Sequence, residues 1–526
     1  MFIQRIYKKT KKKTYSSVVL MENYREDGKV KHRIISNLSK WPERLVAGLE
    51  KLIKGQEIKT VSDLKLSTGK SFGAILTVLE IAKRLGITQA LGNSKQAKLA
   101  MFQIAGRIIS HGSRNYLANE WIKGEAIEQI LKPDSFTEDS LYDNLDWLSE
   151  NQRSIENKIY KYRTKGKPVK NIFLYDVTSS YLEGDKNELA EYGYNRDKKK
   201  GKKQIVIGLL TDSDGYPLSV EVFKGNTGDT KTVSDQLEKL KDNFGVERVI
   251  FVGDKGMIKS AQIEEITSDR YKWNYLTTIT KQQIRGLIDK GKIQLALFDT
   301  DIVEVEADHI RYILRRNPVR SDEIKRNRES KIEYISKLIA KQNLYLKEHK
   351  RAKTEAALKK IDDKISALRL NTIIISKVKD REIIIETDTE GKKKEEELDG
   401  CYVVKTDAPK ESLDAKTAHD RYKDLSKIEF AFRTIKTTLE EIRPIFVRKE
   451  KRTRGHVFVA MLAYMIVKCI TDKLEKLNFT RQFIIESLDK IHYIEYQCEG
   501  ETKTIVPQNL LPHQQQMIDR LEIKLR

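Results

Sequence analysis

Two short apolar runs in the sequence each lead into an aspartate. The run 171–175 is followed by Asp176, and the run 248–252 is followed by Gly253 and Asp254. Such runs, rich in aromatic and branched side chains, predict buried strands. A carboxylate at the end of a buried strand is costly unless something pairs with it, although a single one is equally well explained as the cap of a turn. The repeated arrangement favours a site that both aspartates share.

A third group of polar residues follows further along the chain. Tyr422, Glu429 and Lys436 are seven residues apart, so on one helix each lies only about 20° around the axis from the last. The neighbouring face is apolar, with Leu425, Ile428, Phe432 and Ile435. The pattern predicts a helix with a polar line beside a packed face. A salt-bridged surface helix is the alternative.

The segments around the two aspartates predict a mixed sheet with helices packed on it. Strands are expected at 204–211 and 217–224 around the turn 212–215, then at 248–252 and 273–279, with a helix at 231–244. In such a sheet Asp176 and Asp254 can lie at the ends of neighbouring strands.

Other segments show clear periodicities. Residues 15–40 predict two strands joined at Asp27-Gly28, and 72–163 predict helices, with Thr137 as an N-cap. Residues 321–369 predict a helical hairpin that turns at 347–353 and serves as a strut. Strands are expected at 371–377, 382–386 and 402–405, and a helix buried against the sheet at 457–467.

Composition narrows the class of protein. The chain has 526 residues, enough for two to four domains, and a formal charge of +22 spread over several loops. This excess favours nucleic acid as a partner before a membrane surface. The longest apolar run is 11 residues and the three cysteines are widely spaced, which fits a protein of the reducing cytoplasm. The segment 68–71 (Thr-Gly-Lys-Ser) lacks the earlier glycine that a phosphate loop requires.

Two cationic segments are candidates for contact with a DNA backbone. The loop Arg196–Lys203 carries Lys198, Lys199, Lys200, Lys202 and Lys203, and a later segment carries Arg448, Lys449, Lys451, Arg452 and Arg454. For the loop Arg196–Lys203, the alternative interpretation is a solvated hairpin tip without a DNA contact.

These motifs resemble those of DDE transposases of bacterial insertion sequences, in the insertion-sequence-four superfamily. The two aspartates stand in Tyr-Asp-Val-Thr (175–178) and Gly-Asp-Lys-Gly (253–256), and the loop 225–230 between them also matches. Tyr422, Glu429 and Lys436 fall at the positions of the third motif, but Leu425 replaces its arginine, which indicates a side branch. The similarity extends over about residues 70–475.

The resemblance implies that Asp176, Asp254 and Glu429 are catalytic residues and metal ligands. Helix geometry favours Glu429 over the later glutamates: Glu440 lies about three turns further along the axis and Glu441 points elsewhere, while Glu450 follows Pro444. Three carboxylates suit two Mg²⁺ ions, with Mn²⁺ able to substitute, in an in-line phosphoryl displacement. Tyr422 and Lys436 would then lie near DNA phosphates, and Arg448, Arg452 and Arg454 would add affinity for DNA.

The resemblance also implies an α/β fold with a ribonuclease-H-like mixed sheet. The expected organisation is an N-terminal β-hairpin region (1–65), a helical DNA-binding domain (66–165), a catalytic core in two parts (166–295 and 411–480), an insertion (296–410) and a C-terminal tail (481–526). Contacts to the ends of the element are expected in the helical domain, with Arg107, Arg114 and Lys123 as candidates.

The expected partners are the terminal inverted repeats of the element and target DNA, bound by a homodimer assembled on the ends, with no membrane partner. The expected activity is cleavage at those ends followed by strand transfer into target DNA. Two alternatives stay open. One is a nuclease on the same fold that cuts DNA but does not join strands, and the other is an inactive relative that only binds DNA.

Overall fold

The computed structural model describes residues 1–9, 14–56, 66–165, 171–438, 444–498 and 501–525. These residues form two compact units, one of residues 1–71 and 491–510 and the other of 72–490 and 511–525. No helix of the described ranges is long and apolar enough to cross a membrane.

The first unit is built mainly from strands. β1 (Phe2–Lys9), β2 (Thr14–Glu26) and β3 (Lys29–Asn37) form an antiparallel sheet, followed by α1 (Glu43–Ile53). Asp27 and Gly28 both have positive φ and form the two-residue turn predicted between β2 and β3. A second sheet joins β4 (Leu66–Ser71) to β15 (His492–Cys498) and β16 (Glu501–Ile505). The segment 68–71 therefore belongs to a strand and forms no phosphate loop.

The second unit begins with the predicted helical region. Its elements are α2 (Gly73–Arg84), α3 (Ile87–Leu91), α4 (Lys95–Ile109), α5 (Arg114–Tyr116), η2 (Leu117–Trp121), α6 (Ile122–Gly124), α7 (Ile127–Leu131) and α8 (Glu138–Thr164). The Thr137 side chain accepts a hydrogen bond from the Ser140 N–H, as expected of an N-cap. From the C-terminal part, α17 (Glu450–Leu474), η7 (Glu475–Leu477), α18 (Arg481–Asp489) and α19 (Pro512–Leu521) complete this layer.

An eight-stranded mixed sheet forms the centre of the second unit, in the order β10-β11-β14-β9-β8-β5-β6-β7. Its strands are β5 (Ile172–Tyr181), β6 (Gln204–Asp212), β7 (Pro217–Lys224), β8 (Ile250–Val252), β9 (Asn274–Thr278), β10 (Val303–Ala307), β11 (Ile310–Arg316) and β14 (Cys401–Thr406). β5, β6 and β7 are antiparallel neighbours, and β8 and β9 are parallel to β5. The predicted mixed sheet is thereby confirmed.

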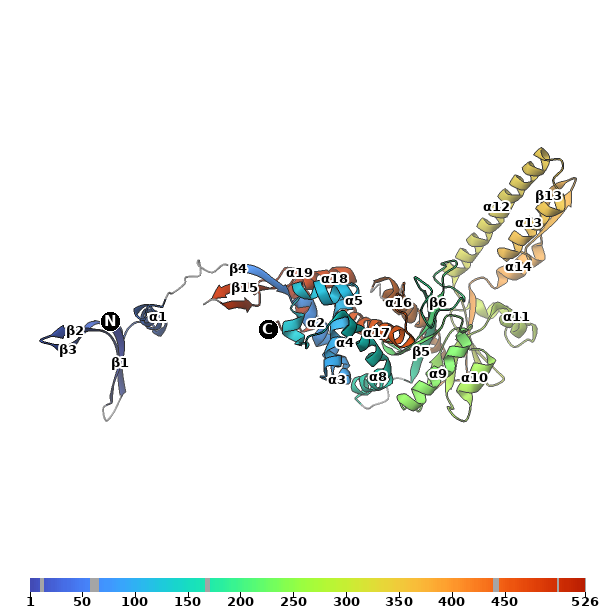
Figure 1. Ribbon diagram of the computed structural model, residues 1–526. Helices are drawn as coiled ribbons and strands as arrows, with labels where there is room; N and C mark the ends of the chain where they lie inside the picture. The colour runs from blue at the N-terminus through green and yellow to red at the C-terminus, as the bar shows by residue number, and fades with distance from the viewer. Residues whose placement is uncertain (10–13, 57–65, 166–170, 439–443, 499–500, 526) are drawn as a thin grey trace. The chain divides into compact units, whose positions relative to one another are not determined.

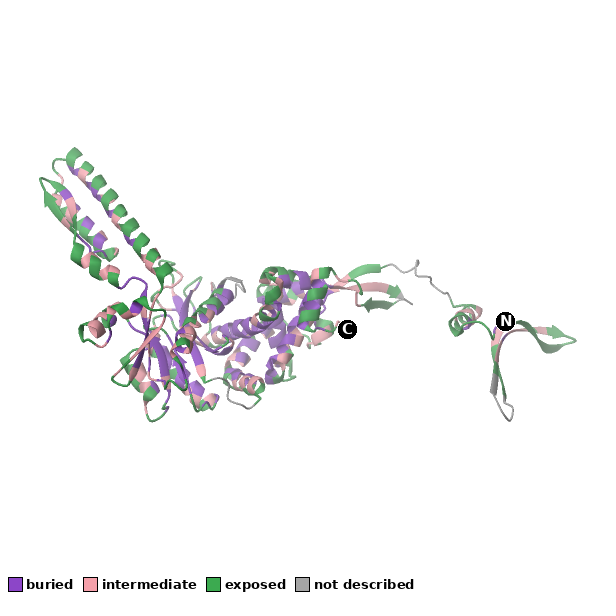
Figure 2. Ribbon diagram, turned by 180° about the vertical axis from the view of Figure 1, so that it is seen from behind, coloured by how far each residue is buried: buried purple, intermediate pink, exposed green. Residues whose placement is uncertain are grey.

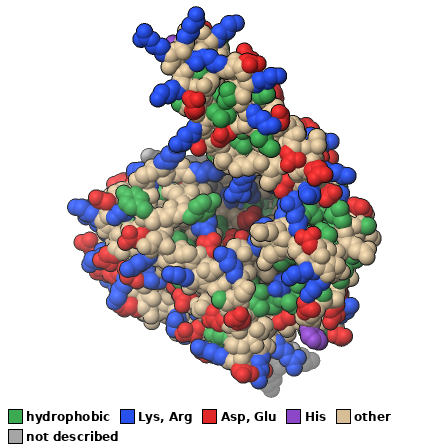
Figure 3. Space-filling view, turned by 90° about the vertical axis from the view of Figure 1, so that its right-hand side faces the viewer, with side chains coloured by type: hydrophobic (Ala, Val, Ile, Leu, Met, Phe, Trp, Pro, Cys, Tyr) green, Lys and Arg blue, Asp and Glu red, His purple; other side chains and the backbone are tan. Residues whose placement is uncertain are grey.

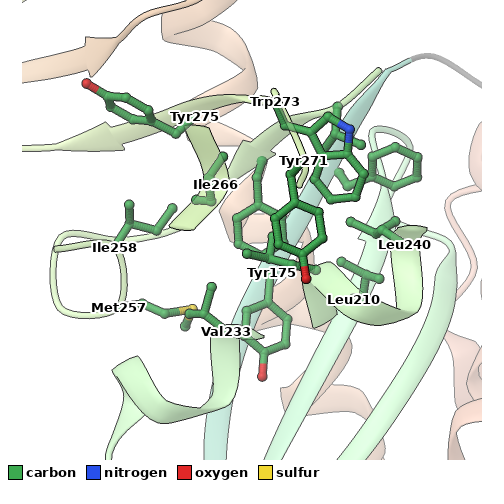
Figure 4. Packing of buried hydrophobic residues seen from close by; sticks show 14 of the residues in the cluster. Tyr175, Leu210, Val233, Leu240, Met257, Ile258, Ile266, Tyr271, Trp273 and Tyr275 are labelled. Carbon is green, nitrogen blue, oxygen red and sulfur yellow. The ribbon is translucent and has the colours of Figure 1, made fainter. Parts of the chain in front are cut away.

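The core of this sheet lies under the helices between its strands. These are η3 (Asp229–Thr232), α9 (Val233–Glu238), η4 (Lys239–Asn243), α10 (Ser260–Thr267), α11 (Lys281–Asp289) and η5 (Leu295–Asp299). Tyr175 of β5 packs there with Val233, Leu240 and Trp273 (Figure 4). Because side chains alternate along a strand, Asp176 projects from the opposite face.

A helical arm extends from the sheet between β11 and β14 (Figure 1). It consists of α12 (Pro318–Glu348), α13 (Thr354–Ala367), β12 (Ile374–Lys379), β13 (Glu382–Thr387) and α14 (Thr389–Glu397). Ile335, Ile339, Ile361 and Ile365 are buried in a small core of the arm's own, which confirms the predicted helical hairpin. Figure 2 shows that most of the arm's surface is exposed while the sheet and α17 are buried.

Helix α17 packs differently from the prediction for residues 457–467. It contacts α8 and α4 as well as β7, so helices cover it as much as the sheet does. At Gly455 an added Cβ would lie 2.1 Å from the Leu145 carbonyl oxygen of α8. This close approach requires glycine and fixes α17 against α8.

Candidate active site

Asp176 lies in the middle of β5, and the prediction that it ends a strand is wrong. β5 continues to Tyr181 because its second half pairs with β6, where Asp176 lies opposite Leu209. On the other side β8 pairs only with the first half, up to Leu174 opposite Val252. β8 stops there, which leaves the edge of β5 open beside Asp176.

Asp254 follows the end of β8 in a tight turn. Its Oδ1 accepts hydrogen bonds from the N–H groups of Gly256 and Met257, both at 2.9 Å. Because β5 and β8 run parallel with Leu174 opposite Val252, two residues further along each chain bring Asp176 and Asp254 to the same level. The two aspartates are thus neighbours, as the sequence predicted.

Glu429 is carried by α16 (Leu425–Arg433), which packs against β5. The single helix predicted for Tyr422, Glu429 and Lys436 is instead α15 (Ala415–Lys423), α16 and the π-helical turn η6 (Thr434–Thr438). Asp424 separates the first two. The three side chains nevertheless line the same pocket.

This acidic pocket has a volume of about 730 Å³ and receives residues from every motif. Its charged lining consists of Asp176, Asp197, Asp229, Asp254, Glu429, Arg196, Lys423, Arg433 and Lys436. Tyr422 also lines it and shares a hydrogen bond of 2.9 Å between its hydroxyl and Thr278 Oγ1. Figure 3 shows a hollow below the projecting arm with side chains of both charges around it.

The carboxylates influence one another electrostatically. Burial is the main reason that the pKa of Asp176 is raised to about 7. The charges of Asp254 and Glu429 raise this pKa further, while the Val177 N–H and the Arg196 charge lower it. Burial also raises the pKa of Tyr422, and the same three carboxylates add to the shift. The phenol therefore stays protonated and can donate a hydrogen bond.

The donor set suits a hard divalent cation. The three carboxylates supply only oxygen, and the pocket lining includes no histidine or cysteine among the described residues. In the described ranges no three His, Cys, Asp or Glu side chains lie close enough together to hold one ion as they stand. The mutual repulsion of unneutralised carboxylates is consistent with this spacing. By donor chemistry and common pocket, Asp176, Asp254 and Glu429 fit the predicted metal.

Lys436 is buried, and its ammonium group has partners within the protein. Its Nζ donates to Thr178 Oγ1 at 2.7 Å and to the Ser179 carbonyl oxygen, and it forms an ion pair of 3.1 Å with Asp197. These contacts tie η6 to the second half of β5. Contact between Lys436 and DNA stays a prediction.

Two residues of the pocket form an ion pair that the sequence reasoning missed. Arg196 Nη2 donates to both carboxylate oxygens of Asp229, at 2.6 and 2.7 Å. Arg196 begins the lysine-rich loop, and Asp229 lies in the loop 225–230. Spacing could not pair them because they are distant in sequence. The pair fixes one wall of the pocket next to Asp176.

The lysine-rich loop precedes β6 and is largely exposed. Lys198, Lys199 and Lys200 are exposed, Lys202 pairs with Glu183 at 2.7 Å, and Lys203 lies over the ring of Tyr192. Its proximity to Arg196 and Asp197 brings the loop to the rim of the acidic pocket.

Two of the three arginines predicted to bind DNA after the polar helix are engaged in internal ion pairs. Arg452 bonds Asp143 and Asp146 of α8, and Arg454 bonds Glu221 of β7 as well as Glu450. They connect α17 to its neighbours because α17 packs against acidic positions of both elements. Arg448 is exposed.

The candidates for end recognition in the helical region are mostly buried, so that prediction is wrong for two of them. Arg107 donates to the carbonyl oxygens of His111 and Gly112, and Arg114 donates to Gln103 Oε1. Both guanidinium groups satisfy groups inside the helical layer and are less than 8% exposed. Lys123 is exposed and pairs with Glu120.

Leu425, which replaces the expected arginine, lines the acidic pocket together with Arg433 and Lys423. The part of the lining around Leu425 therefore still carries two cationic side chains, those of Lys423 and Arg433. Of the alternative glutamates, Glu440 and Glu441 lie outside the described residues. Glu450 begins α17, does not line the acidic pocket, and bonds Arg454.

Comparisons with known proteins agree with the motifs. Residues 167–466 match the family described as transposase DDE domain, and residues 3–62 match the N-terminal domain of IS1634 family transposases. Comparison with curated protein sequences returned no match. Among solved structures, the chain is similar to the piggyBac transposase in a synaptic complex with hairpin DNA, with 9% identity and a TM-score of 0.35 over 74% of this chain and 69% of that one.

Proposed function

The chain belongs to the family of DDE transposases of insertion sequences, and on this basis we propose that Asp176, Asp254 and Glu429 hold the divalent cations of its active site. The observation that carries the proposal is that carboxylates from three separate segments line one pocket. The shift of the Asp176 pKa by the charges of the other two supports it. Mg²⁺ is the proposed cation, with Mn²⁺ as a substitute, because the donors are all oxygen.

The proposed reaction is cleavage of DNA at the ends of the element, followed by joining of the freed ends to target DNA. Bound divalent cations would supply stabilisation of the attacking and leaving oxygens of the phosphodiester displacement. Tyr422, protonated and oriented by Thr278, can donate a hydrogen bond to a phosphate oxygen. Lys436 holds the backbone of β5 through Ser179, three residues beyond Asp176.

A ribonuclease-H-like core and a division of labour along the chain belong to the same proposal. The antiparallel strands β5, β6 and β7, extended in parallel by β8 and β9, support such a core. We assign the core to 166–295 and 411–480, an insertion to 296–410, and DNA binding to the helical region 66–165, with exposed residues such as Lys123 in place of Arg107 and Arg114. A homodimer assembled on two DNA ends is the proposed active form.

Single amide substitutions test the three carboxylates. Asp176→Asn, Asp254→Asn and Glu429→Gln should each lower metal-dependent cleavage of DNA carrying the element's ends by at least about 100-fold, because each removes a cation ligand. DNA binding measured without divalent metal should be unchanged. Glu450→Gln is the matched control and should cut at the wild-type rate.

Stability without metal provides a second readout on the same preparations. Because Glu429 repels the other two carboxylates, Glu429→Gln should leave the metal-free protein folded and at least as stable, with the pKa of Asp176 lowered. Near wild-type cleavage by Glu429→Gln would contradict the assignment.

An assay of joining to target DNA separates a transposase from a nuclease that only cuts.

A further inference from the structure

A second cavity, of about 660 Å³, lies where the central parallel strands begin, whereas the acidic pocket lies further along these strands. Ile172, Ile250 and Asn274, which begin the parallel strands β5, β8 and β9, line it. Asp176 and Asp254 lie further along β5 and beyond β8. Four residues of strand separate Ile172 from Asp176, roughly 13 Å. Among the described residues, none lines both cavities.

The cavity is strongly cationic. Arg248, Lys272 and Arg421 line it from three separate segments, and no aspartate or glutamate is among the described lining residues. Arg248 is exposed and has neither an ion pair nor a side-chain hydrogen bond within the described ranges. Lys272 has only an exposed pair with Asp269 at 3.6 Å. These two charges are available to a ligand.

The wall of the cavity also contains polar atoms that lack partners. Ser213 Oγ and Arg421 Nε are buried and make no hydrogen bond within the described part of the chain. Arg421 keeps one ion pair, with Asp424 at 2.9 Å. Because these two atoms are themselves shielded from solvent, the exposed side chains of Arg248 and Lys272 are the groups that a ligand in the cavity reaches.

We propose that this cavity is a phosphate-binding site, separate from the acidic pocket. Two guanidinium groups and an ammonium group match the charge and the several acceptor oxygens of a phosphate. The volume is sufficient for a nucleotide-sized group. The phosphate belongs either to the backbone of bound DNA outside the catalytic pocket or to a free phosphate ion. The proposal does not depend on which carboxylates hold metal.

Matched charge variants of the full-length chain test the proposal without divalent metal, so that catalysis plays no part. Arg248→Gln/Lys272→Gln removes two charges from the cavity. Lys259→Gln/Lys290→Gln removes two exposed charges that do not line it. All four positions are exposed, so both variants should keep the thermal midpoint of the wild type, which is checked first.

Two measurements distinguish the sources of the phosphate. If the site binds DNA backbone, the slope of log K against log salt for a duplex should decrease by about 2 in the cavity variant and stay unchanged in the control. If it binds a free ion, titration with inorganic phosphate followed by ³¹P NMR should show binding that the cavity variant weakens at least about tenfold, with an unchanged DNA slope. A cavity variant that matches the control in both measurements would overturn the proposal. Loss of cleavage in the carboxylate variants leaves this result unaffected.

Discussion

His456 is a histidine whose burial, together with two neighbouring arginine charges, favours the neutral ring. Its Nδ1 lies 3.0 Å from Arg114 Nη2, inside the contact between α17 and the helical layer. Burial lowers the pKa of His456 well below 6.5, and the charges of Arg114 and Arg107 lower it further. The neutral ring therefore accepts a hydrogen bond from Arg114.

This shift predicts a loss of stability in acid. The pKa in the folded state lies below that in the unfolded state, so below about pH 6.5 the unfolded chain binds more protons. The free energy of unfolding should decrease as the pH falls, by up to about 1.4 kcal/mol per pH unit from this group. Urea unfolding from pH 7.5 to 5 measures the slope, and His456→Gln should reduce it.

The exposed His309 supplies the control. His309→Asn, at a position with φ of 60° that asparagine tolerates, should leave the acid slope unchanged. If the free energy of unfolding decreases with falling pH equally in the wild type and in His456→Gln, other groups cause the instability in acid.

At the scale of elements, a buried ion pair connects the helical layer to the sheet. Lys239 Nζ of η4 lies 3.5 Å from Glu156 of α8 and 2.6 Å from Glu221 of β7, and donates to Ser219 Oγ at 2.6 Å. Burial raises the pKa of Glu156, and the Lys239 charge opposes that shift. The Lys239 charge therefore favours the ionised form of Glu156 against the effect of burial.

Lys239→Met should therefore destabilise the protein by about 3–5 kcal/mol, because it leaves a buried carboxylate without its cation. Glu156→Gln in the same chain should recover part of the loss. Chemical unfolding of the wild type, both single variants and the double variant measures the coupling. Additive effects in this cycle would contradict the account.

The lysine-rich loop before β6 is the element for which a DNA contact is most directly testable. Neutralising Lys198, Lys199, Lys200, Lys202 and Lys203 to glutamine should weaken binding similarly across DNA sequences. The salt slope should decrease by up to about 4–5, since each phosphate contact contributes about 0.9. Fluorescence anisotropy over a salt series measures it.

A variant that neutralises five exposed lysines elsewhere is the control, namely Lys290, Lys337, Lys359, Lys360 and Lys490. Its salt slope should match the wild type. If the loop variant also keeps the wild-type slope, the loop is a solvated hairpin tip with no DNA contact.

At the scale of the whole molecule, the helical arm is structurally separable from the sheet that carries it. The arm has a hydrophobic core of its own, and its two ends meet where the Asn317 N–H donates to the Gly400 carbonyl oxygen at 2.9 Å. Lys and Arg side chains gather at its far end (Figure 3). β11 and β14, which flank the arm in sequence, pair directly with each other from Arg311 opposite Thr406 to Arg316 opposite Cys401.

Replacing residues 322–395 by a short Gly-Ser linker should therefore leave a folded protein. We expect cooperative unfolding, with a free energy of unfolding within about 3 kcal/mol of the wild type. The shortened chain loses the ion pair between Arg328 and Asp399 at the base of the arm, but Lys281 still pairs with Asp399. Denaturant unfolding and near-UV circular dichroism measure this. Loss of the cooperative transition would show that the arm is part of the main core.

The sequence by itself indicated the family and those elements that local patterns specify. The strands on either side of the Asp27-Gly28 turn, the Thr137 cap and the seams of the helical arm depend on contacts between near neighbours, and the structure has each of them. The resemblance of the three carboxylate motifs to those of DDE transposases indicated the family, and the match over residues 167–466 agrees with it. Such patterns can be recognised locally because propensity, capping and periodicity act over a few residues.

Only the tertiary structure decided which charges are free and how strands pair across the sheet. Arg114 is buried because His456 and Gln103 surround it, and Arg452 is paired because α8 presents two aspartates to α17. Asp176 lies within a strand because β6 extends its pairing beyond the end of β8. These outcomes depend on partners that are distant in sequence. Their charges and hydrogen-bonding groups meet only when the chain packs, which is why no local pattern could reveal them.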